Sequence, residues 1–168
     1  TVTGATQGAM YGFRATARCV LGSDIATSSV GPEVTRTMAV TAPSSLTISA
    51  AMSGTNADGT AAGGTCSAGT TIERQIRYHS TSTATDGTWS SWVSGTTRTI
   101  GALQGHKYTF QQQARCVGTS ASSAWTASST AATVRAINAP GAPSVSASTN
   151  GDTTTFTRSN VVCPTGTT

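Results

Sequence analysis

The chain has 168 residues and a formal net charge of +4 at pH 7, with charged side chains making up 10% and aromatic side chains 5%. Its nine arginines are scattered rather than gathered between aromatic residues, which argues against a nucleic-acid-binding protein. No apolar run approaches the roughly 18 residues of a membrane span, so we expect no membrane insertion within this segment.

Threonine accounts for about a fifth of the residues, and its branched β-carbon favours strands over helices. No window has the 3.6-residue apolar rhythm of a long amphipathic helix. The composition and the pattern therefore predict an all-β fold.

The chain repeats itself at an offset of 97 residues without gaps. About 22 of the 71 overlapping positions are identical, and such fixed-period similarity marks a repeat architecture. The matching segments are 7–20 with 104–117, 41–43 with 138–140, and 64–71 with 161–168.

Two Ala-Pro joints, Ala42-Pro43 and Ala139-Pro140, are the natural boundaries of the repeated unit. Proline disfavours helix before it and cannot donate to a strand ladder, so such a joint suits an interdomain link. We predict one complete repeat over 43–139. Residues 1–42 are then the C-terminal part of a preceding repeat, and 140–168 the N-terminal part of a following one.

Within the complete unit, apolar alternation and turn residues predict a series of short strands. A turn over 53–59 separates the first two strands, and Asp86-Gly87 marks a hairpin that returns through Trp89 to Val93. The other predicted strands cover 46–51, a segment leading to Cys66, and 70–80, 96–103, 108–117 and 127–137.

The strand over 108–117 has the clearest alternation. Tyr108, Phe110, Ala114 and Cys116 share one face, and Gln112 interrupts that face. In the strand over 70–80, the apolar face carries the two isoleucines and Tyr78, and the opposite face carries Glu73, Arg77 and His79.

Seven short strands in about 97 residues, with a leucine, a tight turn and a tyrosine at 103–108, resemble the fibronectin type III fold. The resemblance implies an immunoglobulin-like β-sandwich in which the Tyr108 hydroxyl bonds to backbone a few residues upstream. The tryptophan usual on the second strand is missing here: Gly59 stands in that region, and its counterpart in the next copy is Phe156.

Four cysteines, Cys19, Cys66, Cys116 and Cys163, are compatible with disulfides, a metal site or buried thiols. Short C-x2-C pairs are missing, so we predict no zinc site and no other metal or cofactor. The fibronectin-like fold implies a disulfide between Cys66 and Cys116, whose strands end at the same pole. The partners of Cys19 and Cys163 then lie outside this segment or in a neighbouring subunit, which implies an oxidising, extracellular or cell-surface location.

Trp89 and Trp92 are the candidate binding residues. On a strand their spacing would put them on opposite faces, with one ring exposed to stack on a sugar or a neighbouring subunit. Sheet-surface packing is the alternative. His79 and His106 belong to no recognisable catalytic or metal-ligand spacing, and we identify no catalytic residue.

Two functions remain open. The first is a non-catalytic structural segment of tandem repeats, resembling the stalks and fibres of large secreted bacterial adhesins or filament proteins. Its partners would be neighbouring repeats or identical subunits, because bare strand edges recruit strands from other chains. The second is a carbohydrate-binding accessory module of a secreted polysaccharide-degrading enzyme, with cell-surface glycans as ligands.

Overall fold

The structure, a computed structural model, describes residues 2–82 and 87–163, and the prediction of an all-β fold is confirmed for them. No helix of the length and apolarity that a membrane span requires occurs in these residues. The strands are β1 (Met10–Phe13), β2 (Arg18–Leu21), β3 (Asp24–Thr27), β4 (Val34–Thr37), β5 (Leu46–Ser53), β6 (Asn56–Gly63), β7 (Thr71–Thr81), β8 (Val93–Ser94), β9 (Thr97–Gly101), β10 (Lys107–Val117), β11 (Thr126–Val134), β12 (Val145–Asn150) and β13 (Thr153–Arg158).

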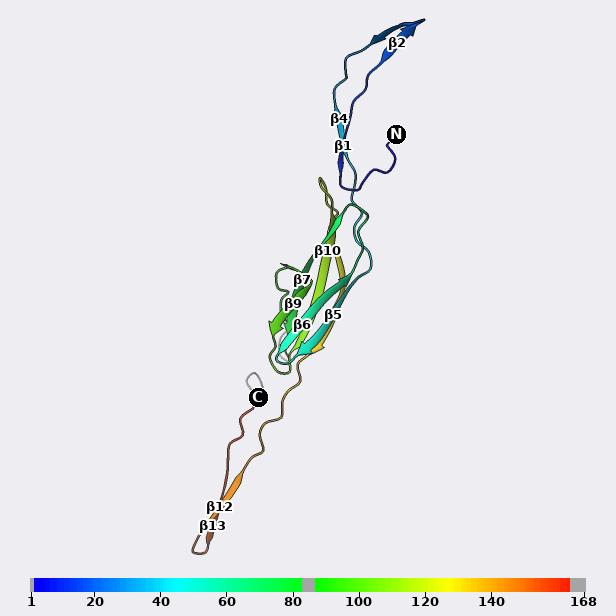
Figure 1. Ribbon diagram of the computed structural model, residues 1–168. Helices are drawn as coiled ribbons and strands as arrows, with labels where there is room; N and C mark the ends of the chain where they lie inside the picture. The colour runs from blue at the N-terminus through cyan, green and yellow to red at the C-terminus, as the bar shows by residue number, and fades with distance from the viewer. Residues whose placement is uncertain (1, 83–86, 164–168) are drawn as a thin grey trace.

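The middle of the chain forms two antiparallel sheets that pack face to face (Figure 1). One sheet has the strand order β5-β6-β9, and the other has the order β11-β10-β7-β8. The last strand, β11, lies against the first strand, β5, across the two layers. All of these strands lie within 46–134, and together they form a two-layered β-sandwich.

Most predicted strands differ from the observed ones by only a few residues. The main exception is the segment that follows the hairpin predicted at Asp86-Gly87, of which Asp86 lies outside the described residues. The segment from Gly87 to Trp92 is loop, and β8 is limited to Val93–Ser94. Strand β6 also ends three residues before Cys66, because Gly63 and Gly64 both adopt positive φ and turn the chain.

The core lies between the two sheets and centres on Phe110, which is 0% exposed. Its ring lies directly over the backbone of Gly59 in the facing sheet, where an added Cβ would come within 2.3 Å of the Phe110 Cδ1 atom. A glycine at this position therefore makes room for the largest fully buried side chain. The other buried apolar members of the core are Ala57, Ala61, Ile76, Ala102 and Tyr108.

Gln112, which interrupts the apolar face of β10, is fully buried and bridges the two sheets. Its amide nitrogen donates to the carbonyl oxygens of Thr47 and Ala62, and its amide oxygen accepts from Arg74 at 3.2 Å. A buried amide is tolerated in a core when its hydrogen bonds are made inside the protein. Gln112 thus links β10 to two strands of the facing sheet, β5 and β6, through hydrogen bonds.

The Tyr108 hydroxyl accepts a hydrogen bond from the backbone N–H of Leu103 at 2.8 Å, closing the corner before β10. The N-terminal segment contains the same corner, where the Tyr11 hydroxyl accepts from the Thr6 N–H, also at 2.8 Å. Only Tyr108 is buried; Tyr11 is partly exposed.

Replacing Tyr108 with phenylalanine is expected to destabilise the sandwich by about 1–3 kcal/mol, because the Leu103 N–H loses its partner. The change is measured as the shift of the urea unfolding midpoint. Tyr11→Phe is the matched control, because water can replace the lost hydroxyl at the exposed Thr6 N–H. It should leave the midpoint unchanged within experimental error. Equal shifts for both variants would contradict this interpretation.

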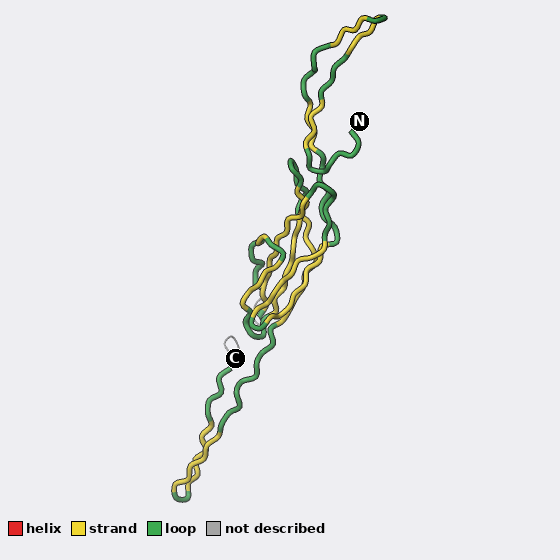
Figure 2. The backbone as a smooth tube through the Cα atoms, in the orientation of Figure 1, coloured by secondary structure: helices red, strands yellow, loops and turns green. Residues whose placement is uncertain are grey.

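Two hairpins extend from opposite ends of the sandwich and give the molecule an elongated shape (Figure 1). At the N-terminal end, β1 pairs with β4 and β2 pairs with β3, so that residues 10–37 form one long two-stranded ribbon. At the C-terminal end, β12 pairs with β13. Figure 2 shows that long loop segments connect these strand pairs.

The pairing register of each hairpin matches the register of strands in the sandwich. Met10 pairs with Thr37, and 97 positions later Lys107 pairs with Val134. All four pairs of β1 with β4 recur in β10 and β11, and all six pairs of β12 with β13 recur in β5 and β6. The N-terminal ribbon therefore corresponds to β10–β11, and the C-terminal hairpin corresponds to β5–β6.

Among residues 2–82 and 87–163, no second sheet covers either hairpin as one covers their counterparts in the sandwich. Phe13, the equivalent of the buried Phe110, is 43% exposed, and Phe156, the equivalent of Gly59, is 73% exposed. Val20, Ile25 and Val145 are also exposed. Both hairpins thus present apolar side chains that an opposing sheet would cover.

Candidate functional site

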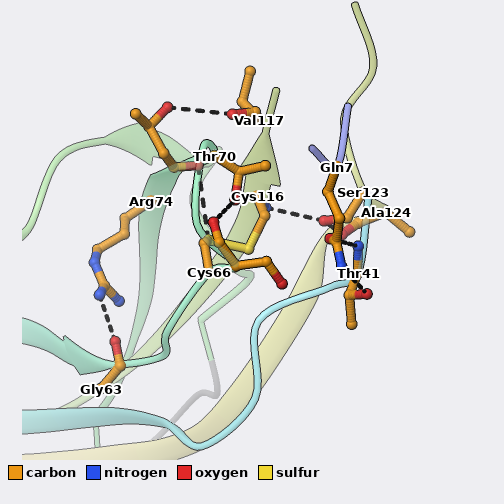
Figure 3. The surroundings of a disulfide bond; sticks show 12 residues. Gln7, Thr41, Gly63, Cys66, Thr70, Arg74, Cys116, Val117, Ser123 and Ala124 are labelled. Atoms are coloured by element: carbon orange, nitrogen blue, oxygen red, sulfur yellow. Dashed lines mark hydrogen bonds between the residues drawn. A yellow bond between two sulfur atoms is a disulfide. The ribbon is translucent and has the colours of Figure 1, made fainter. Parts of the chain in front are cut away.

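Cys66 and Cys116 form a disulfide with an S–S distance of 2.02 Å and a Cα–Cα distance of 5.6 Å (Figure 3). This is the pair that the fibronectin-like resemblance implied. Cys66 follows β6 and Cys116 lies near the end of β10, so the bond ties the two sheets together at the pole facing the N-terminal ribbon. Ser123 completes the arrangement, because its hydroxyl accepts from the Cys116 N–H at 3.0 Å.

The segment before the N-terminal ribbon contacts the sandwich at this same pole, through glycines. Gly8 adopts a φ of +73° and packs on Gly118, where a Cβ added to either residue would lie 2.6 Å from the other's Cα. The Gly8 carbonyl accepts a hydrogen bond from the Ser120 N–H at 2.7 Å. A Cβ at Gly69, in the loop before β7, would lie 2.2 Å from Thr6. The joint is therefore a close backbone-to-backbone contact.

A glutamine side chain fixes the chain on the ribbon side of the joint. The Gln7 amide accepts from the Thr41 N–H at 2.8 Å and donates to the Thr41 hydroxyl at 3.1 Å, next to the disulfide (Figure 3). At the other pole of the sandwich, the Gln104 amide accepts from the Asn138 N–H at 2.8 Å. The glutamine hydrogen bond found at the joint is thus present a second time, at the start of the C-terminal segment.

Cys19 and Cys163 are free and exposed. Cys19 lies on β2 at the position equivalent to Cys116, and Cys163 follows β13 at the position equivalent to Cys66. Each hairpin therefore presents one half of the cysteine pair that is joined in the sandwich.

The two candidate tryptophans lie on the outer face of the β7–β10 sheet, and neither belongs to the core. The expectation that they occupy opposite faces of a strand is wrong, because the segment that carries them is loop. The Arg77 guanidinium carbon lies 4.5 Å from both ring centroids, those of Trp89 and Trp92, in two cation–π contacts. His79 meets Trp89 edge-on at 4.4 Å.

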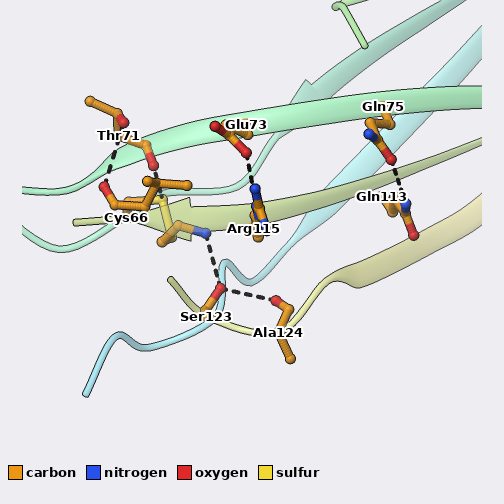
Figure 4. Close-up of polar contacts among 10 residues, drawn as sticks. Cys66, Thr71, Glu73, Gln75, Gln113, Arg115, Ser123 and Ala124 are labelled. Atoms are coloured by element: carbon orange, nitrogen blue, oxygen red, sulfur yellow. Dashed lines mark hydrogen bonds and ion pairs between the residues drawn. A yellow bond between two sulfur atoms is a disulfide. The ribbon is translucent and has the colours of Figure 1, made fainter. Parts of the chain in front are cut away.

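Arg77 belongs to a row of paired polar side chains along this outer face. Its guanidinium donates to Gln111 on β10, and further along the two strands Gln113 donates to Gln75 at 2.7 Å (Figure 4). Arg115 then pairs with Glu73 at 2.8 Å (Figure 4). These cross-strand pairs hold β7 and β10 in register.

Trp125 ends this row, under the Arg115 guanidinium, whose carbon lies 4.7 Å from the ring centroid. The sequence indicated which side chains point outward on β7, but it did not reveal that arginines cover the tryptophan rings. The contact of Arg77 with Trp89 and Trp92 depends on the path of the loop over 87–92, whose sequence carries no periodic signal. No cluster of three or more metal-ligating side chains occurs among residues 2–82 and 87–163.

The chain was compared with protein-family models, with curated proteins and with solved structures, and it matches none of them.

Proposed function

We propose that this chain is a structural segment of a tandem array of fibronectin type III-like, immunoglobulin-like sandwiches, which forms a rod in an extracellular fibre or adhesin stalk. Each 97-residue unit is closed by one disulfide. It is joined to the next unit through the Ala-Pro link and through a glycine contact like that of Gly8 with Gly118. The rod is a non-catalytic spacer that holds other parts of an assembly at a distance from the cell.

The observation that carries this proposal is the shared register of the hairpins and the sandwich. Every β1–β4 and β12–β13 pair recurs 97 positions away in the complete unit. The hydrogen bond accepted by the Tyr11 hydroxyl and the one accepted by the Gln7 amide recur there as well. The strand orders β5-β6-β9 and β11-β10-β7-β8 are also compatible with a fibronectin-like sandwich. An oxidised Cys66–Cys116 pair suits an extracellular location.

The arrangement of the tryptophans gives less support to a carbohydrate-binding module. A sugar platform needs an open aromatic face, whereas Arg77 covers one face of Trp89 and of Trp92. The same guanidinium is held by Gln111, so it cannot swing away without breaking two hydrogen bonds.

Small-angle X-ray scattering on the purified chain tests the rod. We expect an elongated distance distribution for the native protein, and a shorter, broader one for Gly118→Val, because a side chain there collides with the Gly8 backbone. Gly141→Val is the matched control, since a Cβ at Gly141 meets nothing within 4 Å. A compact native particle, or identical curves for the two variants, would contradict the proposal.

A further inference from the structure

The chain contains two hairpins with the same register, and only one of them belongs to the sandwich. All six pairs of β12 with β13 recur in β5 and β6, so the C-terminal hairpin has the backbone pairing needed to replace β5–β6 against β10 and β11. Exchange of segments between neighbouring units is a characteristic misfolding of multidomain and repeat proteins. The structure nevertheless shows β12–β13 extended away from the sandwich (Figure 1).

The link between β11 and β12 is long enough to permit this exchange. The disulfide joins the chain after β6 to the end of β10, so β6 and β10 run in the same direction, and so do their partners β5 and β11. To replace β5, the hairpin must therefore return along β11, which is about 30 Å long for its nine residues. The link over 135–144 reaches about 33–36 Å when extended, so chain length does not prevent the exchange.

We infer that three side chains of β13, Thr154, Phe156 and Arg158, prevent this exchange and so determine which hairpin completes the sandwich. The inference rests on the proposed function, because in a tandem array the C-terminal hairpin belongs to the following repeat. The three residues are then specificity-determining positions, which keep the segments of neighbouring repeats apart during folding.

All three side chains stand at the positions of small, buried residues. Their counterparts on β6 are Ala57, Gly59 and Ala61, which are buried in the sandwich. Each residue of β13 is larger than its counterpart, so the C-terminal hairpin would bring additional volume into a space that is already filled. Packed cores tolerate such additions poorly, because neither side chains nor backbone have room to move.

Phe156 meets a direct steric obstacle. At its counterpart Gly59, a Cβ alone would lie 2.3 Å from the Cδ1 atom of Phe110 and 2.6 Å from its Cγ atom. A whole phenyl ring at that position would overlap the Phe110 ring, which is 0% exposed and enclosed by the core. Phe156 and Phe110 are therefore incompatible within a sandwich of this shape.

Arg158 would bring a charge into the core. Its counterpart Ala61 is 7% exposed and belongs to the core cluster. A guanidinium is unfavourable in such a place unless an anion pairs with it. The guanidinium of Arg74 donates to the carbonyl oxygen of the next residue, Ala62, so the charge already close to this position has the same sign.

The cysteines report which hairpin is docked. Cys66 pairs with Cys116 in the sandwich, and exchange would bring Cys163, the counterpart of Cys66, to Cys116 instead. The first bond has a sequence separation of 50 residues and the second would have one of 47, so loop closure alone favours neither. The exposed, free Cys19 is replaced by serine throughout, so that only these three thiols compete.

Oxidative refolding measures the competition. The reduced, unfolded chain is refolded in a glutathione redox buffer at low protein concentration, so that bonds form within one chain, and the disulfides are mapped by mass spectrometry of proteolytic peptides. We expect the Cys66–Cys116 bond to exceed the Cys116–Cys163 bond at least tenfold. Equal amounts of the two bonds would overturn the inference, because the hairpins would then exchange freely.

A triple variant removes the three obstacles together. Thr154→Ala, Phe156→Gly and Arg158→Ala give β13 the inward residues of β6 and leave every residue of the sandwich unchanged, so folding of the sandwich is not at risk. We expect the share of the Cys116–Cys163 bond to rise at least fivefold, because the hairpin then fits against β10. An unchanged share would overturn the inference.

The matched control changes the other face of the same strand. Thr153→Asn and Thr155→Asp give β13 the residues of Asn56 and Asp58, which alternate with the inward positions of β6. These substitutions make the two hairpins more alike without changing their fit to the core, and they should leave the disulfide pairing unchanged. A rise equal to that of the triple variant would show that the inward side chains are not the cause.

Failure of this inference is distinguishable from failure of the proposed function. An elongated scattering profile together with an unchanged pairing ratio in the triple variant would leave the tandem rod in place and remove only the role of the three side chains. A compact native particle would contradict the rod, whatever the pairing ratio.

Discussion

Replacing both Cys66 and Cys116 with alanine is expected to destabilise the sandwich by about 4 kcal/mol. The bond closes a loop with a sequence separation of 50 residues, and its removal restores that loop's conformational freedom to the unfolded chain. For a unit of about 100 residues this corresponds to a fall of roughly 15–30 °C in the thermal midpoint. The free energy of unfolding of a native protein is only about 5–15 kcal/mol, so the loss is a large part of the stability.

Differential scanning calorimetry at constant protein concentration measures this effect. The double substitution of Cys19 and Cys163 is the control, because both cysteines are exposed and unpaired in the single chain and should leave the midpoint unchanged. A fall of less than about 5 °C on removal of Cys66 and Cys116 would show that the disulfide contributes little beyond the packing of the two sheets.

Phe110→Ala is expected to cost about 3–5 kcal/mol, since it empties the centre of the core. Phe13→Ala removes the equivalent side chain from the exposed ribbon and should leave the free energy of unfolding within about 0.5 kcal/mol of its original value. Chemical denaturation of both variants measures the difference. Similar losses for the two would contradict the assignment of the core to the middle of the chain.

The close contact between Phe110 and Gly59 can be tested by combining substitutions at the two positions. Gly59→Ala alone is expected to cost about 1–3 kcal/mol, because its methyl group collides with the Phe110 ring. In combination with Phe110→Ala the same methyl group partly fills the cavity. The double variant should therefore be more stable than the sum of the single losses implies, and strict additivity would contradict the contact.

The strands of the sandwich could be predicted because their residues alternate. On β10, the residues predicted to face inward, Tyr108, Phe110, Ala114 and Cys116, are all buried. Gln112 breaks that alternation, and its role could not be foreseen, because the hydrogen-bond partners of its side chain lie on three other strands. Local periodicity shows which face is buried but not what a polar residue meets there.

The contacts of the candidate site were less accessible from sequence. Gly8 and Gly118 are 110 positions apart, and only the fold brings their backbones together. The sequence did contain a signal for Gly8, because Gly8 and Gly105 occupy equivalent positions of the repeat. In the structure the two glycines have nearly the same positive φ. The stacking of Arg77 on two tryptophans had no such signal, because it is set by a loop rather than by a strand.

In the proposed rod, the position of the disulfide would also determine how a unit responds to tension. A pull on the two Ala-Pro links is transmitted to β5 and β11, which lie next to these links. The covalent loop from Cys66 to Cys116 is bypassed by the force, so about 170 Å of otherwise extensible polypeptide stays locked, at roughly 3.4 Å per residue. An overloaded unit would therefore lengthen only through its outer segments and would refold from a closed inner loop.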